Sequence, residues 1–302
     1  MYENDDPVHQ LVHLYVDGAF GRRELWKRVA KYTGSMAAAT VALGGFEELK
    51  AQPTPCPAGI KVPVDADDIV VQDVEFMASD GAKIMGHFAY PKDMTEPQPG
   101  VIVIHENRGL VDHIKDVTRR TARAGFVAVG VDLLSRQGGV QAFPEPTQQT
   151  AAYGRTTVEQ RRLDLIAGMD YLKNSDRVVF DRIGVFGFCA GGANTWDLIV
   201  NVPELAAAIP FYGAPPTAEQ MANIRTPVLA MYAETDRALT LRMAPVITEM
   251  ITRQKVFGIN IYQGVGHAFH NDTGAAYNAE AACDAWSRTV GFLNKHLRAP
   301  RA

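Results

Sequence analysis

One cysteine lies in a segment that could present a nucleophile. The apolar run that begins at Ile183 leads into Gly187-Phe188-Cys189-Ala190-Gly191, and the next residues, Ala193 to Val200, are compatible with a helix. Glycines on both flanks permit a sharp turn from strand to helix, because side chains there would collide with their neighbours. The helix would point its first N–H groups at the sulfur and favour the thiolate. We therefore predict that Cys189 is a nucleophile and that the N–H of Ala190 binds an oxyanion.

An isolated free cysteine is more often a small buried apolar residue, so this hypothesis needs a base and an acid. His267 follows an apolar run in Gly264-Val265-Gly266-His267, and Asp236 follows the apolar run Val228 to Tyr232. The chain order nucleophile, acid, histidine is typical of a catalytic triad at the carboxyl ends of parallel strands. Glu234, in the same loop, is the alternative acid, but the end of the loop offers Asp236 the longer reach.

Two residue pairs raise the question of a metal site. His267 and His270 have H-x-x-H spacing, and His105 precedes Glu106. Neither pair has a predicted helix and a third ligand nearby, so we expect no metal.

Short apolar runs separated by helical stretches would position these residues. Ile69 to Phe76 and Lys83 to Ala89 alternate apolar and polar residues, which predicts an antiparallel hairpin at a sheet edge. Runs that are apolar on both faces predict buried parallel strands. They are Val101–Ile104, Phe126–Val131, Ile183–Phe186, Ala207–Phe211, Val228–Tyr232 and Phe257–Tyr262. Helical spacing of apolar residues recurs around 117–124, 165–172 and 281–293. We therefore expect an α/β domain with a mostly parallel sheet and helices on both faces.

The proline-rich stretch Gln52 to Val64 blocks both helix and strand, as expected of a linker. We accordingly place an N-terminal helical extension and linker at residues 1–63 and the catalytic domain at residues 64–302. Helices at roughly Pro7 to Val16 and Arg22 to Tyr32 would form the extension.

An export signal is the alternative interpretation of this extension. Arg22-Arg23 is followed by the Ala-rich run Met36 to Phe46, which resembles a twin-arginine segment. The position where a cleavage site would lie instead carries the charged residues Glu47, Glu48 and Lys50. We expect a cytoplasmic protein, with a periplasmic location as the alternative.

Composition excludes other classes of protein. The 302 residues carry a formal net charge of −4, and their lysines and arginines are scattered, unlike those of a nucleic-acid-binding protein. No stretch approaches the roughly 20 apolar residues of a membrane span. Cys56, Cys189 and Cys283 show no C-x-x-C spacing, which argues against a disulfide framework or zinc site.

Together these motifs resemble the dienelactone hydrolase family, the carboxymethylenebutenolidases, over roughly Val74 to Leu297. The matching residues are the elbow Gly187-Phe188-Cys189-Ala190-Gly191-Gly192, Asp236, His267 and the segment Phe211-Tyr212-Gly213. The resemblance implies the α/β-hydrolase fold and hydrolysis of small-molecule esters or lactones through a thioester acyl-enzyme. It implies no cofactor.

The resemblance also implies functions for residues outside the triad. Glu106 ends a matching strand segment and would hold the resting cysteine as a thiol, then take its proton when substrate displaces the carboxylate. The N–H of Asn107 would be the second oxyanion donor. Arg136, in Asp132-Leu133-Leu134-Ser135-Arg136, would bind a substrate carboxylate, and Tyr212 would also contact substrate.

One position departs from the family pattern. Where members that cleave dienelactone carry a second arginine beyond the histidine, this chain has Asn271. Weaker preference for a carboxylated substrate is therefore expected, with Arg108 as an alternative source of positive charge. A thiol redox protein and a non-catalytic binding protein of the same fold are the alternative functions.

Overall fold

The computed structural model describes residues 11, 22–35 and 61–298. The chain divides into two compact units, residues 1–55 and 56–302. In the first unit, helix α2 (Arg22–Thr33) confirms the second predicted helix, and Glu24 pairs with Arg28 one turn later. The other predicted helix, Pro7 to Val16, and the Ala-rich run lie outside the described residues.

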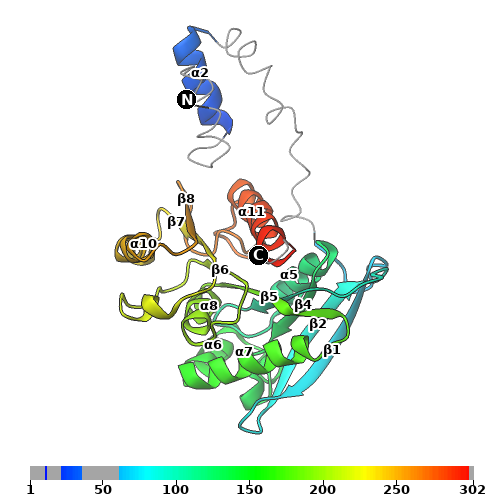
Figure 1. Ribbon diagram of the computed structural model, residues 1–302. Helices are drawn as coiled ribbons and strands as arrows, with labels where there is room; N and C mark the ends of the chain where they lie inside the picture. The colour runs from blue at the N-terminus through cyan, green and yellow to red at the C-terminus, as the bar shows by residue number, and fades with distance from the viewer. Residues whose placement is uncertain (1–10, 12–21, 36–60, 299–302) are drawn as a thin grey trace. The chain divides into compact units, whose positions relative to one another are not determined.

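Among the residues that the structure describes, eight strands of the second unit form one sheet in the order β1-β2-β4-β3-β5-β6-β7-β8 (Figure 1). The strands are β1 (Ile69–Met77), β2 (Lys83–Pro91), β3 (Gln98–Ile104), β4 (Val127–Val131), β5 (Val178–Phe188), β6 (Ala207–Phe211), β7 (Val228–Ala233) and β8 (Phe257–Tyr262). The hairpin β1–β2 is antiparallel at the sheet edge, as predicted, and β2 also pairs antiparallel with β4. All other neighbouring strands are parallel.

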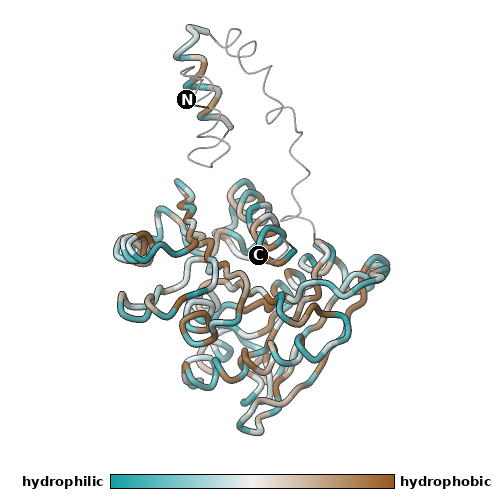
Figure 2. Tube along the Cα trace, viewed as in Figure 1, coloured by the Kyte–Doolittle hydropathy of each residue, from teal (hydrophilic) through white to brown (hydrophobic). Residues whose placement is uncertain are grey.

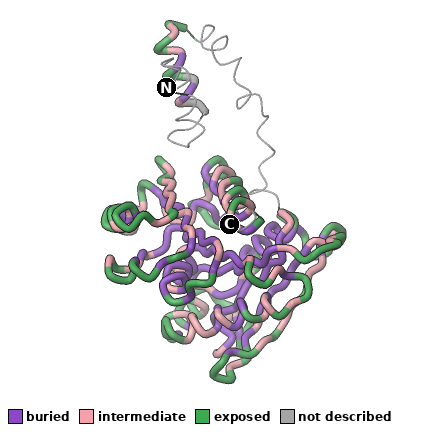
Figure 3. Tube along the Cα trace, in the orientation of Figure 1, coloured by how far each residue is buried: buried purple, intermediate pink, exposed green. Residues whose placement is uncertain are grey.

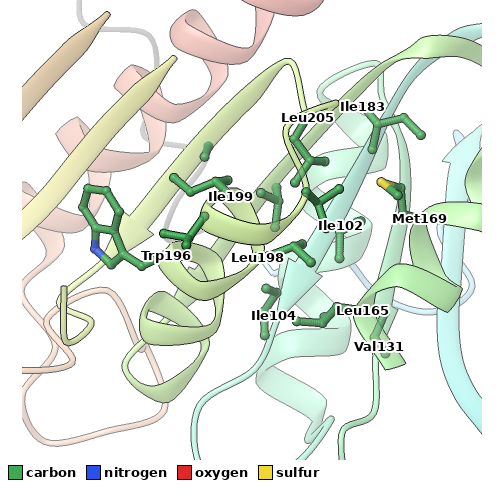
Figure 4. Packing of buried hydrophobic residues seen from close by; sticks show 14 of the residues in the cluster. Ile102, Ile104, Val131, Leu165, Met169, Ile183, Trp196, Leu198, Ile199 and Leu205 are labelled. Atoms are coloured by element: carbon green, nitrogen blue, oxygen red, sulfur yellow. The ribbon is translucent and has the colours of Figure 1, made fainter. Parts of the chain in front are cut away.

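Helices cover both faces of this sheet. They are α5 (Asp112–Arg123), α6 (Pro146–Arg155), α7 (Val158–Lys173), α8 (Ala190–Asn201), α9 (Arg237–Thr240), α10 (Met243–Thr252) and α11 (Ala279–Leu297), with short 3-10 turns at Ser135–Gln137, Val140–Ala142 and Gln220–Asn223. Residues of α7, α8 and α10 share one apolar cluster, part of which Figure 4 shows, and residues of α5 and α11 share the other.

The alternation of side chains along the strands explains why the apolar runs are continuous. Ile102 and Ile104 point into the first cluster, whereas Val101 and Val103 point into the second. Because both faces of a central strand are covered, every position must be apolar. Figures 2 and 3 show the result, a hydrophobic and buried sheet inside a more polar, exposed surface.

The second unit begins earlier than the sequence predicted. Val62 is 2% exposed, and its N–H donates to Asp116 Oδ1 at 2.7 Å. The sequence placed the boundary after residue 63, because proline content locates a linker without showing where packing starts. None of the described helices is long and apolar enough to cross a bilayer.

Candidate active site

Cys189 lies at the tight turn between β5 and α8. Its φ is +57° and its ψ is −114°, a conformation that costs a non-glycine residue energy and that the surroundings must enforce. A Cβ on Gly187 would lie 2.4 Å from the Gly191 carbonyl oxygen, and one on Gly191 would lie 2.5 Å from the His105 carbonyl oxygen. These close approaches explain both glycines, and they join the turn to the loop that carries Glu106.

His267 and Asp236 are adjacent to each other, as predicted. The Nδ1 of His267 donates to Asp236 Oδ2 at 2.5 Å. Glu234 is exposed and instead accepts a hydrogen bond from the Gly264 N–H at 2.9 Å. The structure therefore pairs the histidine with Asp236 and not with the alternative acid.

The electrostatics of His267 link it to Cys189. A hydrogen bond with the Cys189 side chain is the largest cause that raises the pKa of His267 to about 9; burial opposes the rise and Asp236 adds to it. Its interactions with Cys189 and Asp236 therefore favour the protonated imidazole. The arrangement can donate a proton to a leaving group and then act as a base.

Glu106 follows β3 and is nearly buried, with 6% exposure. Its Oε2 accepts a hydrogen bond from Asn271 Nδ2 at 2.9 Å. The Oδ1 of Asn271 accepts from the N–H and the hydroxyl of Thr273, at 3.0 and 2.6 Å. These donors fix the amide orientation, so the NH₂ group must face Glu106. The other carboxylate oxygen, Oε1, has no hydrogen-bond partner among the described residues.

Tyr212 follows β6 and lies between these groups. Its side chain is fully buried, and its ring centroid lies 4.9 Å from that of His267. Burial raises the pKa of Tyr212 well above its usual value, and the charges of Glu106 and Cys189 add to this effect. Tyr212 is therefore close to both His267 and Glu106.

The proposed oxyanion donors lie on the two loops that meet at Gly191. Ala190 is the first residue of α8, so its N–H has no acceptor within the helix. Asn107 directly follows Glu106. We retain both N–H groups as predicted oxyanion donors.

Arg136 has partners that differ from the predicted substrate carboxylate. Its guanidinium donates to both carboxylate oxygens of Asp80, at 2.8 and 3.1 Å, and to Asp164 at 2.9 Å. Two carboxylates thus engage the donors of Arg136, and its binding of a substrate carboxylate stays a prediction. The sequence could not show that the hairpin turn and α7 converge on this side chain. Arg108 is 42% exposed and lies 4.0 Å from Glu106 Oε2, which keeps it a candidate for contact with substrate.

Two of the three histidines considered as metal ligands, His105 and His270, pack among residues of the fold. His105 Nε2 accepts from the Leu133 N–H at 2.9 Å, and its Nδ1 contacts the Glu106 carbonyl. His270 is buried and stacks on Phe188, with ring centroids 4.8 Å apart. Among the described residues, no group of His, Cys, Asp and Glu side chains could hold a metal ion.

Sequence reasoning missed one aromatic residue near the nucleophile. Tyr153 of α6 accepts a hydrogen bond from Asn194 Nδ2 at 2.9 Å, and the Arg161 guanidinium lies 4.7 Å from its ring centroid. Burial raises the pKa of Tyr153, and the charge of Cys189 contributes to the rise. No motif marks Tyr153, since α6 brings it close only through the fold.

The cysteines also differ from expectation. Cys189 is free, whereas Cys283 on α11 is disulfide-bonded. The spacing of the cysteines argued against a disulfide framework, and the bond at Cys283 corrects that expectation. Residues distant in the sequence can pair without any recognisable motif.

Comparisons with known proteins agree with this geometry. The model of the dienelactone hydrolase family matches residues 84–297. A Saccharolobus solfataricus protein named "Putative carboxymethylenebutenolidase" is 33% identical over 256 residues, 73% of this chain and 97% of that protein. A Bradyrhizobium protein named "Probable 2-oxo-3-(5-oxofuran-2-ylidene)propanoate lactonase" is 30% identical and covers 77% of this chain and 97% of its own length. A Klebsiella pneumoniae structure titled "Putative Dienelactone Hydrolase" has a TM-score of 0.69 and 26% identity, covering 75% of this chain and 99% of that one.

Proposed function

Because this chain belongs to the dienelactone hydrolase family and is a hydrolase of ester or lactone bonds, we propose that Cys189 is its nucleophile and that it forms a thioester acyl-enzyme. The single observation that carries this proposal is the link between Cys189 and His267, whose Nδ1 contacts Asp236 at 2.5 Å. A thiol, a base and an orienting acid in this order can transfer an acyl group.

In the first half-reaction, the sulfur of Cys189 attacks the carbonyl carbon and its proton passes to Glu106. The N–H groups of Ala190 and Asn107 stabilise the oxyanion. The tetrahedral intermediate collapses to a thioester, and the protonated His267 gives its proton to the departing oxygen.

In the second half-reaction, neutral His267 takes a proton from water, and the oxygen attacks the thioester carbon. The carbon–sulfur bond breaks, and the thiolate of Cys189 recovers its proton from Glu106. The products are a carboxylic acid and an alcohol, and every group returns to its starting state. No step uses a cofactor.

The function of Glu106 rests on its buried position and on its contact with Asn271. If Glu106 restrains the thiol, iodoacetamide should alkylate Cys189 slowly in the wild type and faster in Glu106→Ala. Equal rates would contradict this function.

We infer that this site accepts neutral small-molecule esters and lactones about as well as carboxylated ones. Asn271 carries no charge, and Arg136 is paired with Asp80 and Asp164. Arg108, 42% exposed, is the charged side chain left beside Glu106 to meet an acidic group.

We also propose that the enzyme works in an oxidising compartment, the alternative to the expected cytoplasmic location. The disulfide at Cys283 supports this proposal, because reduced cytosol keeps most thiols free. Arg22-Arg23, at the start of α2, would belong to the export signal.

The test of the main proposal is a burst experiment with a nitrophenyl ester. We expect the wild type to release nitrophenol in a burst equal to the enzyme concentration, followed by slower turnover. Cys189→Ala should give neither phase, and a wild-type rate in that variant would refute the nucleophile.

A further inference from the structure

A buried ionic cluster connects α5 to the loop that carries His267. The Nδ1 of His113 lies 3.0 Å from Asp272 Oδ1, and Arg120 Nη2 donates to Asp272 Oδ2 at 2.5 Å. The same Arg120 nitrogen also donates to Asp116. Each of these four side chains is at most 8% exposed. One guanidinium thus bridges two carboxylates from distant parts of the chain.

The loop held by this cluster is the one on which the proposed chemistry depends. Asp272 directly follows Asn271, which contacts Glu106, and the Asn271 N–H donates to the Ala268 carbonyl at 3.0 Å. Ala268, next to His267, has a φ of +63°. A residue with a side chain keeps that conformation only where its surroundings enforce it.

The other side of the cluster is anchored to the body of the domain. Asp116 accepts the Val62 N–H at 2.7 Å, one helical turn before Arg120. Arg120 therefore joins a fixed point on α5 to a strained loop. Buried ion pairs add little net stability over apolar residues of the same shape. The ion pair between Arg120 and Asp272 is therefore better explained by its effect on the position of the loop than by its effect on stability.

We propose that Arg120 is a positioning residue, which holds the loop in place through its ion pair with Asp272. The loop then keeps His267 in contact with Cys189. It also keeps Asn271 in contact with Glu106. This inference rests on the proposed function of those four residues. Arg120 itself touches no reacting atom. Its removal should lower the rate of the chemical step and leave substrate binding nearly unchanged.

The decisive variant is Asp272→Asn, which keeps the size of the side chain and removes its charge. We expect kcat for a nitrophenyl ester to fall by about a hundredfold, the effect of a small displacement of a reacting group, with KM little changed. Arg120→Lys should give an intermediate kcat, because an ammonium cannot bridge two carboxylates as a guanidinium does. If Asp272→Asn does not fold, the kcat of Arg120→Lys tests whether Arg120 positions the loop.

Two control variants separate positioning from stability. Asp116→Asn removes the other carboxylate of Arg120 but leaves its contact with the loop, so kcat should stay close to wild type even where the melting temperature falls. Arg123→Met, one turn further along α5, breaks an exposed pair with Asp68 and should change neither quantity. If Asp272→Asn keeps the wild-type kcat and only melts earlier, as Asp116→Asn does, the cluster is merely structural and the inference is wrong.

A second readout does not require hydrolysis. NMR titration of His267 should give a pKa of about 9 in the wild type and Asp116→Asn, and a lower pKa in Asp272→Asn, where the histidine moves away from Cys189. An unchanged pKa in Asp272→Asn contradicts positioning. A wild type that hydrolyses no ester would instead refute the proposed function, and the titration would still decide whether Arg120 positions the loop.

Discussion

The Nδ2 of Asn271 donates to Oε2 of Glu106 at 2.9 Å, although the two residues lie 165 positions apart. An uncharged amide thus lies beside the buried glutamate, at the position that the sequence comparison identified as a departure from the family pattern. The contact joins the β3 loop to the His267 loop. We propose that this contact also influences which substrate charges the site accepts.

Substrate charge preference should respond to Asn271→Arg. We expect the wild type to hydrolyse a neutral methyl ester of a carboxylated lactone about as well as the free acid. The arginine should raise kcat/KM for the acid by about ten- to a hundredfold, or about 1.5–3 kcal/mol for one charge-assisted contact. A wild type that already prefers the acid by several hundredfold, with no gain from Asn271→Arg, would indicate that Arg108 supplies the charge.

The pKa of His267 should depend on Cys189 more than on any other group. NMR titration should show the pKa falling from about 9 in the wild type towards its ordinary value of about 6.5 in Cys189→Ala, and by less in Asp236→Asn. Because the folded-state pKa is raised, the stabilisation from this group is complete below about pH 6.5 and is lost as the pH rises through about 9. A pKa that stays near 9 without the thiol would assign the effect to Asp236.

His270→Phe should stabilise the protein. Both ring nitrogens of His270 are buried and lack hydrogen-bond partners among the described residues, and burial lowers its pKa to about 3. An unpaired buried polar group costs about 1–3 kcal/mol, which phenylalanine avoids while keeping the stacking on Phe188.

Acidic pH should make this difference larger. Below about pH 6.5 the unfolded chain protonates His270 and the folded protein does not, so the wild type loses stability as the pH falls towards about 3. Urea unfolding at pH 7 and pH 5 measures both effects. A less stable His270→Phe at both values would mean that the ring nitrogens have partners.

Reduction should destabilise the fold and spare the active site. Breaking the disulfide at Cys283 should lower the free energy of unfolding by about 2–4 kcal/mol, whereas ester hydrolysis at 25 °C should persist because Cys189 is a separate free thiol. Melting curves with and without dithiothreitol check this, with Cys283→Ser as the control that reduction should not affect further. Identical curves for the wild type would show that the bond contributes nothing.

The sequence predicts those parts of the fold and site that depend on local pattern. The runs before Cys189, Asp236 and His267 are apolar because central strands are covered on both faces, and parallel strands bring the following loops to one edge. The structure shows this arrangement, including the contact between Asp236 and His267.

Contacts between charged residues distant in the chain could not be predicted. Arg136 pairs with Asp80 and Asp164, and Arg120 with Asp272, over separations of 56, 28 and 152 residues. Such pairs depend on the paths of the loops, which the hydrophobic periodicity of the sequence does not predict. The same holds for the disulfide of Cys283.

Locating the acyl group tests the central claim most directly. The wild type is mixed with a nitrophenyl ester, quenched in acid during the burst, digested and mapped by mass spectrometry. We predict one acyl group per enzyme on the peptide that contains Cys189, removable by hydroxylamine as a thioester, and none in Cys189→Ala. An acyl group on another residue, or continued turnover by Cys189→Ala, would contradict the assignment of Cys189 as the nucleophile.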